Sequence, residues 1–216
     1  MRYDRSYLAV VLDRSGSMAG CRQATISGFN EFLAQQQAEP EQARLYLAQF
    51  DDQYELVYDK PLNLAQKLTE DTYVPRGMTA LFDAMGKTIN DLGKKLSEIP
   101  ESERPAKVLV AIITDGQENS SHEFFQWQIA DLVREQQSKY SWKFVFIGAN
   151  QDAVLTAAKF NIDRNSAITY TANNVSGVMA QSLNSYTKAV RGATGQSMLA
   201  AAGTFTDEER CAATAA

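Results

Sequence analysis

The sequence predicts an α/β protein in which helices cover both faces of a six-stranded, mostly parallel sheet. Two continuous apolar runs, Tyr7–Leu12 and Val108–Ile113, are typical of strands buried on both faces. Such runs alternate along the chain with segments whose apolar residues recur every three or four positions, which is the helical pattern. A chain of 216 residues is long enough to form one such domain with a substantial core.

The first half of the chain contains three predicted strands. Tyr7–Leu12 is the first, and a helix whose apolar face includes residues 26–33 follows it. Leu45–Phe50 and Tyr54–Tyr58 are the second and third strands. Because only Asp51–Gln53 separates them, they are expected to form a hairpin, which makes the third strand antiparallel and places it at the edge.

The second half alternates helices and strands more regularly. Ser120 and Glu123 have the spacing of a capping box, so a helix is expected to begin at Ser120. The other expected elements are a short helical piece at Asn63–Leu68, a long helix at Ala80–Leu96, strands at Val108–Ile113, Lys143–Ile147 and Ala167–Thr171, a short helix at Asp152–Phe160 and a last helix at Asn174–Val190. One domain over residues 1–191 accounts for all of them.

Residues 192–216 are rich in Ala, Gly, Ser and Thr and offer little to bury. They are expected to form a flexible or weakly structured tail. The chain carries a net charge of −5, which argues against nucleic acid or an anionic membrane as the main partner. Cys21 and Cys211 are far apart and the sequence contains a single histidine, which argues against a zinc site. Free thiols are favoured over a disulfide between the two cysteines.

No apolar stretch approaches the roughly 20 residues of a membrane helix, and the N-terminus lacks the features of a secretory signal. A cytoplasmic location is therefore the expectation.

Oxygen-bearing side chains gather in three predicted loops. The turn after the first strand carries Asp13, Ser15 and Ser17 at alternate positions, and Asp115 follows the fourth strand directly. Thr79 lies in a glycine-containing loop before the long helix. In a parallel sheet, ligands bind beyond the carboxyl ends of the strands, where the strand order reverses. Carboxylates and hydroxyls are hard donors of the kind that Mg²⁺ prefers.

This pattern resembles the metal-ion-dependent adhesion site (MIDAS) of von Willebrand factor A (vWA) domains, which also occurs in integrin I domains. The D-x-S-x-S turn, the distant threonine and the T-D-G aspartate match in order and spacing, and the resemblance covers about residues 5–191. It implies the Rossmann-like vWA fold and a metal site formed by Asp13, Ser15, Ser17, Thr79 and Asp115.

By the same resemblance, the two serines contact the metal directly, the threonine does so in the ligand-competent state, and the two aspartates act directly or through water. The implied ion is Mg²⁺, with Mn²⁺ or Ca²⁺ as alternatives. The implied function is a protein-binding module without enzymatic activity. An Asp or Glu carboxylate of a protein partner would complete the coordination of its metal ion. Family members of the bacterial or phage-type intracellular kind point to an ATPase or another complex subunit as that partner.

Other interpretations of these residues remain open. Asp13 and its serines are also typical of a simple helix cap. A Mg²⁺-dependent hydrolase such as a phosphatase is the alternative function, although Ser15 stands where the second aspartate of a D-x-D-x-T motif would be. Glu118 and Asn119 are interpreted as a solvated loop, with support of the site as the alternative, and His122 as a surface residue in the first turn of a helix.

Overall fold

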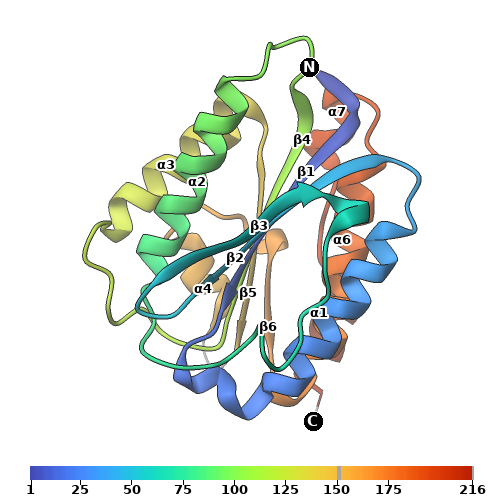
Figure 1. Cartoon of the computed structure of the whole chain (residues 1–216). Coiled ribbons are helices and arrows are strands. Elements are labelled where there is room, and N and C mark those ends of the chain that lie inside the picture. The colour runs from blue at the N-terminus through green and yellow to red at the C-terminus, as the bar shows by residue number, and fades with distance from the viewer. Residues whose placement is uncertain (150–151, 216) are drawn as a thin grey trace.

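A single six-stranded sheet runs through the centre of the computed structural model, which describes residues 1–149 and 152–215 (Figure 1). The strands are β1 (Arg2–Asp13), β2 (Gln42–Phe50), β3 (Tyr54–Pro61), β4 (Pro105–Thr114), β5 (Lys143–Ala149) and β6 (Ala167–Tyr170). Their order is β3-β2-β1-β4-β5-β6, and all neighbours are parallel except β2 and β3. The predicted fold class is confirmed, including the antiparallel edge strand.

Helices cover both faces of this sheet. One face is covered by α1 (Arg22–Gln37) and by a last long helix that consists of α5 (Val175–Gly177), a π-helical segment (Val178–Leu183) and α6 (Asn184–Arg191). The opposite face is covered by α2 (Leu81–Ser97), α3 (Gln126–Tyr140) and α4 (Ala153–Ala158). Figure 1 shows α2 and α3 on one side of the strands and α1 and α6 on the other.

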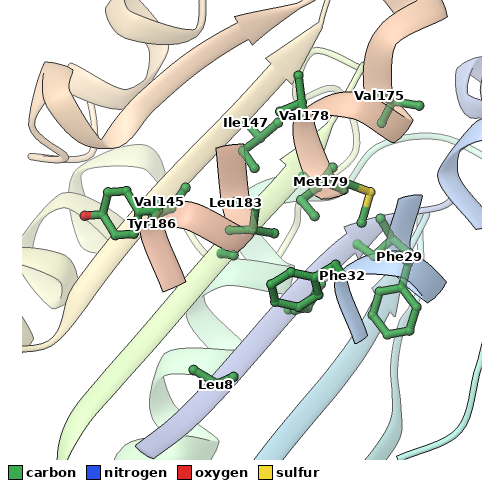
Figure 2. Packing of buried hydrophobic residues seen from close by; sticks show 14 of the residues in the cluster. Leu8, Phe29, Phe32, Val145, Ile147, Val175, Val178, Met179, Leu183 and Tyr186 are labelled. Carbon is green, nitrogen blue, oxygen red and sulfur yellow. The ribbon is translucent and has the colours of Figure 1, made fainter. Parts of the chain in front are cut away.

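The central strand β1 illustrates why the sequence gives this layering. From Tyr7 to Asp13 every residue is buried, and successive side chains point to opposite faces. Leu8 packs in the cluster beneath α1 and the last helix, while its neighbour Tyr7 belongs to the cluster beneath α2 and α3. Figure 2 shows Phe29 and Phe32 of α1 beside the side chains of the last helix, over the strands. A run that is apolar on both faces is stable only in such a central position.

Helix α3 begins at Gln126, so the expectation of a helix from Ser120 was wrong. Two carboxylates bind the backbone N–H groups of this stretch and hold it in an irregular loop. Asp83 of α2 accepts hydrogen bonds from the N–H groups of residues 122–124, at 2.8–3.0 Å. Glu118 accepts those of residues 120 and 121. The capping-box spacing is local, whereas these carboxylates reach the loop through the tertiary fold.

The C-terminal segment differs from the flexible tail that the sequence predicts. Its described part contains α7 (Gln196–Ala201) and α8 (Asp207–Thr214), and Leu199, Phe205 and Ala213 are buried. The segment also packs beside β6, where the backbone N–H of Thr171 donates to the carbonyl of Ala213 at 3.1 Å. Three buried apolar side chains, together with hydrogen bonds from Arg210 to the carbonyls of Ala167 and Arg164, attach the segment.

The short helical piece expected at Asn63–Leu68 is reduced to one 3₁₀ turn at Leu62–Leu64. Both cysteines are free thiols, Cys21 buried and Cys211 exposed. Within residues 1–149 and 152–215, no helix has the length and apolar character needed to cross a membrane.

The order of the strands reverses at the centre of the sheet, between β1 and β4. Strands β1 and β4 are parallel neighbours at its centre, and the chain leaves them toward opposite faces, through α1 and α3. Such a reversal opens a space beyond the carboxyl ends of the two strands. Asp13 is the last residue of β1, and Asp115 directly follows β4. The fold therefore brings the two predicted acidic ligands to the same place.

Candidate metal-binding site

The turn after β1 brings its acid and hydroxyls together. Asp13 is fully buried, and its Oδ1 accepts a hydrogen bond from the backbone N–H of Ser15 at 2.6 Å. This bond folds the chain back into the 3₁₀ helix Gly16–Cys21. As a result the hydroxyl oxygens of Ser15 and Ser17 lie 3.0 Å apart. The turn thus presents two hydroxyls beside a buried carboxylate.

The last residue of β4 and the residue that follows it contact this turn through two hydrogen bonds. The hydroxyl of Ser17 donates to Oδ1 of Asp115 at 2.5 Å. The hydroxyl of Thr114 donates to Oδ2 of Asp13 at 2.5 Å, so both carboxylate oxygens of Asp13 are engaged. The two acids and two serines expected from the sequence are therefore in one cluster.

Thr79 reaches the same cluster from a third loop. The backbone N–H of Gly16 donates to the carbonyl of Gly77 at 3.2 Å, which ties the two loops together. A Cβ placed on Gly116 would lie 2.7 Å from Oγ1 of Thr79 and 3.5 Å from Oδ2 of Asp13. The threonine hydroxyl thus lies against Gly116 on the side of the first aspartate. The structure brings all five predicted residues together.

Burial shapes the electrostatics of the two acids. Loss of solvent raises the pKa of Asp13 to about 6, and the negative charge of Asp115 adds to the shift. Burial also raises the pKa of Asp115, against the hydrogen bond from Ser17. Both carboxylates are therefore held in surroundings that disfavour their ionised form, a penalty that a nearby cation would relieve.

The donor set fits a hard divalent ion. It consists of three hydroxyls and two carboxyls, the oxygen ligands that Mg²⁺, Mn²⁺ and Ca²⁺ accept. In residues 1–149 and 152–215, no group of three or more His, Cys, Asp or Glu side chains could hold a metal. A site rich in thiolates or imidazoles is thus not the chemistry that this part of the chain offers.

An ion-pair cluster supports the site from the side of β2. Asp51 is fully buried, and its Oδ2 accepts from Nε of Arg14 at 3.1 Å and from Nε of Arg76 at 2.8 Å. Burial alone would raise the pKa of Asp51, but the hydrogen bond from Arg76 and the two positive charges lower it overall. Because Arg14 lies in the serine turn and Arg76 in the threonine loop, one carboxylate fastens both loops. The sequence indicated only a turn at Asp51, because Arg14 and Arg76 are far from it along the chain and no motif connects them to it.

The loop after Asp115 contains contacts that sequence reasoning missed. Asn119 is exposed and Glu118 half-buried, as a solvated loop implies, but Glu118 is hydrogen-bonded to α2 and Asn119 to Thr79, which that interpretation did not include. Thr114 and Gly116 also contribute, one by holding Asp13 and the other by leaving space for Thr79. His122 is exposed, as expected, but it lies in the loop rather than in a helical turn. The T-D-G motif was the available sequence signal for Thr114 and Gly116.

A protein-family model identifies the family of this chain. The family model of the von Willebrand factor type A domain matches residues 8–191. The chain belongs to this family. No curated protein matches it.

Several solved structures share the vWA fold with this chain. A von Willebrand factor type A protein from Catenulispora acidiphila has a TM-score of 0.60 at 10% identity, over 86% of this chain and 43% of that chain. Proximal thread matrix protein 1 from the mussel byssus, with a zinc-occupied MIDAS motif, has a TM-score of 0.58 at 18% identity, over 83% of this chain and 48% of that chain. Manganese-loaded TRAP protein from Plasmodium vivax has a TM-score of 0.50 at 12% identity, over 95% of this chain and 77% of that chain. The chain spans less than half the length of the first two.

Proposed function

We propose that this vWA domain binds one divalent cation through Asp13, Ser15, Ser17, Thr79 and Asp115 and uses it to capture an acidic group of a protein partner. The observation that carries the proposal is the convergence of three loops on one cluster of oxygen donors, joined by the contact between Ser17 and Asp115. Mg²⁺ is the proposed ion, with Mn²⁺ and Ca²⁺ as alternatives.

The hydrogen bonds of the cluster suggest a division of labour. Both oxygens of Asp13 already accept hydrogen bonds, which suits a role through bound water. The hydroxyls of Ser15 and Ser17 contact each other and can turn their lone pairs toward an ion. An ion with few direct carboxylate ligands keeps positive charge for an outside anion, and a carboxylate of the partner would complete its coordination.

Two findings in relatives agree with a metal at this place. The mussel byssus protein has a zinc-occupied MIDAS motif, and the Plasmodium vivax protein is manganese-loaded. Members of the vWA family generally serve adhesion and interaction, and we propose a non-enzymatic role here as well. The partner proposed from the sequence is an ATPase or another complex subunit in the cytoplasm, with neither nucleic acid nor membrane as ligand.

The alternative of a Mg²⁺-dependent hydrolase lacks comparable support. Ser15 occupies the place of the second aspartate of a phosphatase motif. A cavity of about 690 Å³, large enough for a small substrate, includes Arg5, Gln36 and Arg44 in its lining but none of the five site residues. Four of the five site residues are buried and Ser17 is exposed, so a partner would have to reach the cluster with a protruding side chain beside Ser17.

The test is titration of the purified protein with Mg²⁺ and Mn²⁺, followed by an acidic peptide. Wild type is compared with Ser17→Ala at the site and with Ser97→Ala, whose hydroxyl donates to a backbone carbonyl in α2. We expect Ser97→Ala to bind like wild type and Ser17→Ala to lose most metal affinity. The peptide should bind only when metal is present. Hydrolysis of a generic phosphate ester by the wild type would instead favour the enzyme.

A further inference from the structure

The backbone of Thr79 is held on both sides by one residue, Asn119. The N–H of Thr79 donates to Oδ1 of Asn119 at 2.9 Å. The N–H of Asn119 in turn donates to the carbonyl of Thr79 at 3.0 Å. The side chain and the main chain of Asn119 thus bind both backbone groups of Thr79, and we call this pair of hydrogen bonds the clamp. Thr79 and Asn119 are 40 positions apart in sequence.

The clamp is anchored in a loop that is itself fixed. Next to Asn119, the carboxylate of Glu118 accepts from the backbone N–H of Phe82 at 3.0 Å and from the hydroxyl of Ser121 at 2.7 Å. The hydroxyl of Ser121 also accepts from the backbone N–H of Asp83 at 3.1 Å. These bonds join the loop after β4 to the first turn of α2. Asn119 therefore connects Thr79 to the strand end that carries Asp115.

Other contacts hold the loop of Thr79 at Arg76, Gly77 and Ala80, whereas Asn119 holds the backbone groups of Thr79 itself. The segment 74–79 has no regular secondary structure, and Gly77 within it has a φ of +66°, a region that favours glycine. The hydroxyl of Thr79 must also lie in the narrow space beside Gly116. A small rotation of the Thr79 backbone would move this oxygen away from the cluster.

We propose that Asn119 is a positioning residue of the metal site. In this proposal it orients the Thr79 hydroxyl toward the ion and is not itself a ligand; its Oδ1 accepts the Thr79 N–H. The inference rests on the proposed function, because it assumes that Thr79 is a metal ligand. Groups that orient metal ligands commonly change metal affinity about 10- to 100-fold when removed.

The first experiment is calorimetric titration of Mn²⁺ into Asn119 variants. Asn119→Ala removes the acceptor of the Thr79 N–H, and we expect about tenfold weaker binding or more. Asn119→Asp keeps an oxygen acceptor at the same place and should retain wild-type affinity or exceed it. Ser121→Ala is the matched control, because it removes loop hydrogen bonds that do not touch Thr79.

The second experiment separates positioning from general loosening of the loop. Thr79→Ala removes the hydroxyl but keeps the backbone groups that Asn119 binds. If Asn119 acts through that hydroxyl, Asn119→Ala should cause no further loss of metal affinity in the Thr79→Ala background. Amide hydrogen exchange in metal-free protein gives an independent readout. The Thr79 amide should exchange faster in Asn119→Ala and remain as protected as in wild type in Ser121→Ala.

Three results would overturn the inference while leaving the proposed function intact. The first is that Asn119→Ala binds metal as tightly as wild type. The second is that Ser121→Ala loses as much metal affinity as Asn119→Ala. The third is that Asn119→Ala causes the same loss of metal affinity in the Thr79→Ala background as in wild type. Failure of the wild type to bind any divalent ion would instead remove the proposed function and this inference with it. Faster exchange at Thr79 in that case would show only that the clamp exists.

Discussion

The hydroxyl of Ser17 donates a 2.5 Å hydrogen bond to Oδ1 of Asp115, across 98 positions of sequence. This contact joins the turn after β1 to the loop after β4, at the point where the sheet reverses its direction of winding. In metal-free protein it keeps a hydroxyl proton between two oxygens that would both face the ion. Binding of a cation requires this proton to turn away, so the contact is expected to be replaced by metal ligation.

Replacement of Asp115 by alanine should abolish metal binding and preserve the fold. The residue lies beyond the end of β4, outside both apolar clusters, so its loss leaves the core unchanged. Burial already raises the pKa of Asp115, and removal of one of two neighbouring acids relieves repulsion on Asp13. Circular dichroism and thermal melting in EDTA should match wild type or show a slightly higher Tm. Global unfolding of the variant would assign Asp115 a structural role instead.

Stability of the metal-free protein should decrease as pH rises through about 6. The pKa of Asp13 is about 6 in the folded protein, above the roughly 3.9 of an unfolded chain. The folded state therefore binds the extra proton between these values. The stabilisation from the protonated carboxyl is complete below about pH 4 and is lost on passing pH 6, to the extent of about 3 kcal/mol.

The measurement is urea denaturation in EDTA between pH 4 and 7.5, with Asp13→Asn as the reference. Asparagine cannot titrate, so the difference between the two proteins isolates this carboxyl. Metal affinity should change in the opposite sense and weaken below pH 6, because the proton competes with the ion. A flat difference between wild type and variant across this range would contradict the expectation.

Alanine at position 116 should weaken metal binding through a clash. The added Cβ would lie 2.7 Å from Oγ1 of Thr79, closer than real side chains tolerate. Either the threonine or the loop must shift, and we expect at least about a tenfold loss of metal affinity, similar to the loss of an orienting group. Gly93→Ala in α2 is the control, since its Cβ would meet nothing within 4 Å.

The control should gain about 0.4–1 kcal/mol of stability from the reduced freedom of its unfolded chain. Its metal affinity should remain that of the wild type. Equal metal affinity in both glycine variants would show that Thr79 has room to move and that the close approach at Gly116 is unimportant.

The elements that the sequence predicted well are those determined by local pattern. The β1 and β4 strands are buried on both faces, so their apolar runs were unambiguous. The motif around Asp13 also indicated which side chains would meet. The irregular loop 120–125 was not predicted, because it depends on Asp83, a carboxylate about 40 positions away. The packed C-terminal segment was missed for a related reason: Phe205 is buried against Tyr186, a contact without a local signal.

The opposite end of the sheet contains a buried charge cluster that should determine stability without affecting the site. The carboxylate of Glu41 contacts Nζ of Lys107 at 2.5 Å and Nε of Arg191 at 3.3 Å. Both cationic side chains are only 2% exposed. Glu41 also accepts a hydrogen bond from the hydroxyl of Ser6 at 2.9 Å. A single carboxylate thus neutralises two buried cations and joins the end of α6 to β4.

Glu41→Gln should therefore destabilise the protein by about 3–5 kcal/mol, because it leaves two buried positive charges without a counterion. The control is Glu39→Gln, which removes a more exposed ion pair with Lys188 and should cost at most about 1 kcal/mol. Urea denaturation at neutral pH measures both. Mn²⁺ affinity of folded Glu41→Gln should equal that of wild type, since the cluster lies at the amino ends of β1 and β4. A loss below about 1 kcal/mol would mean that water or backbone carbonyls, such as that of Arg191 bound by Lys107, suffice to stabilise these cations.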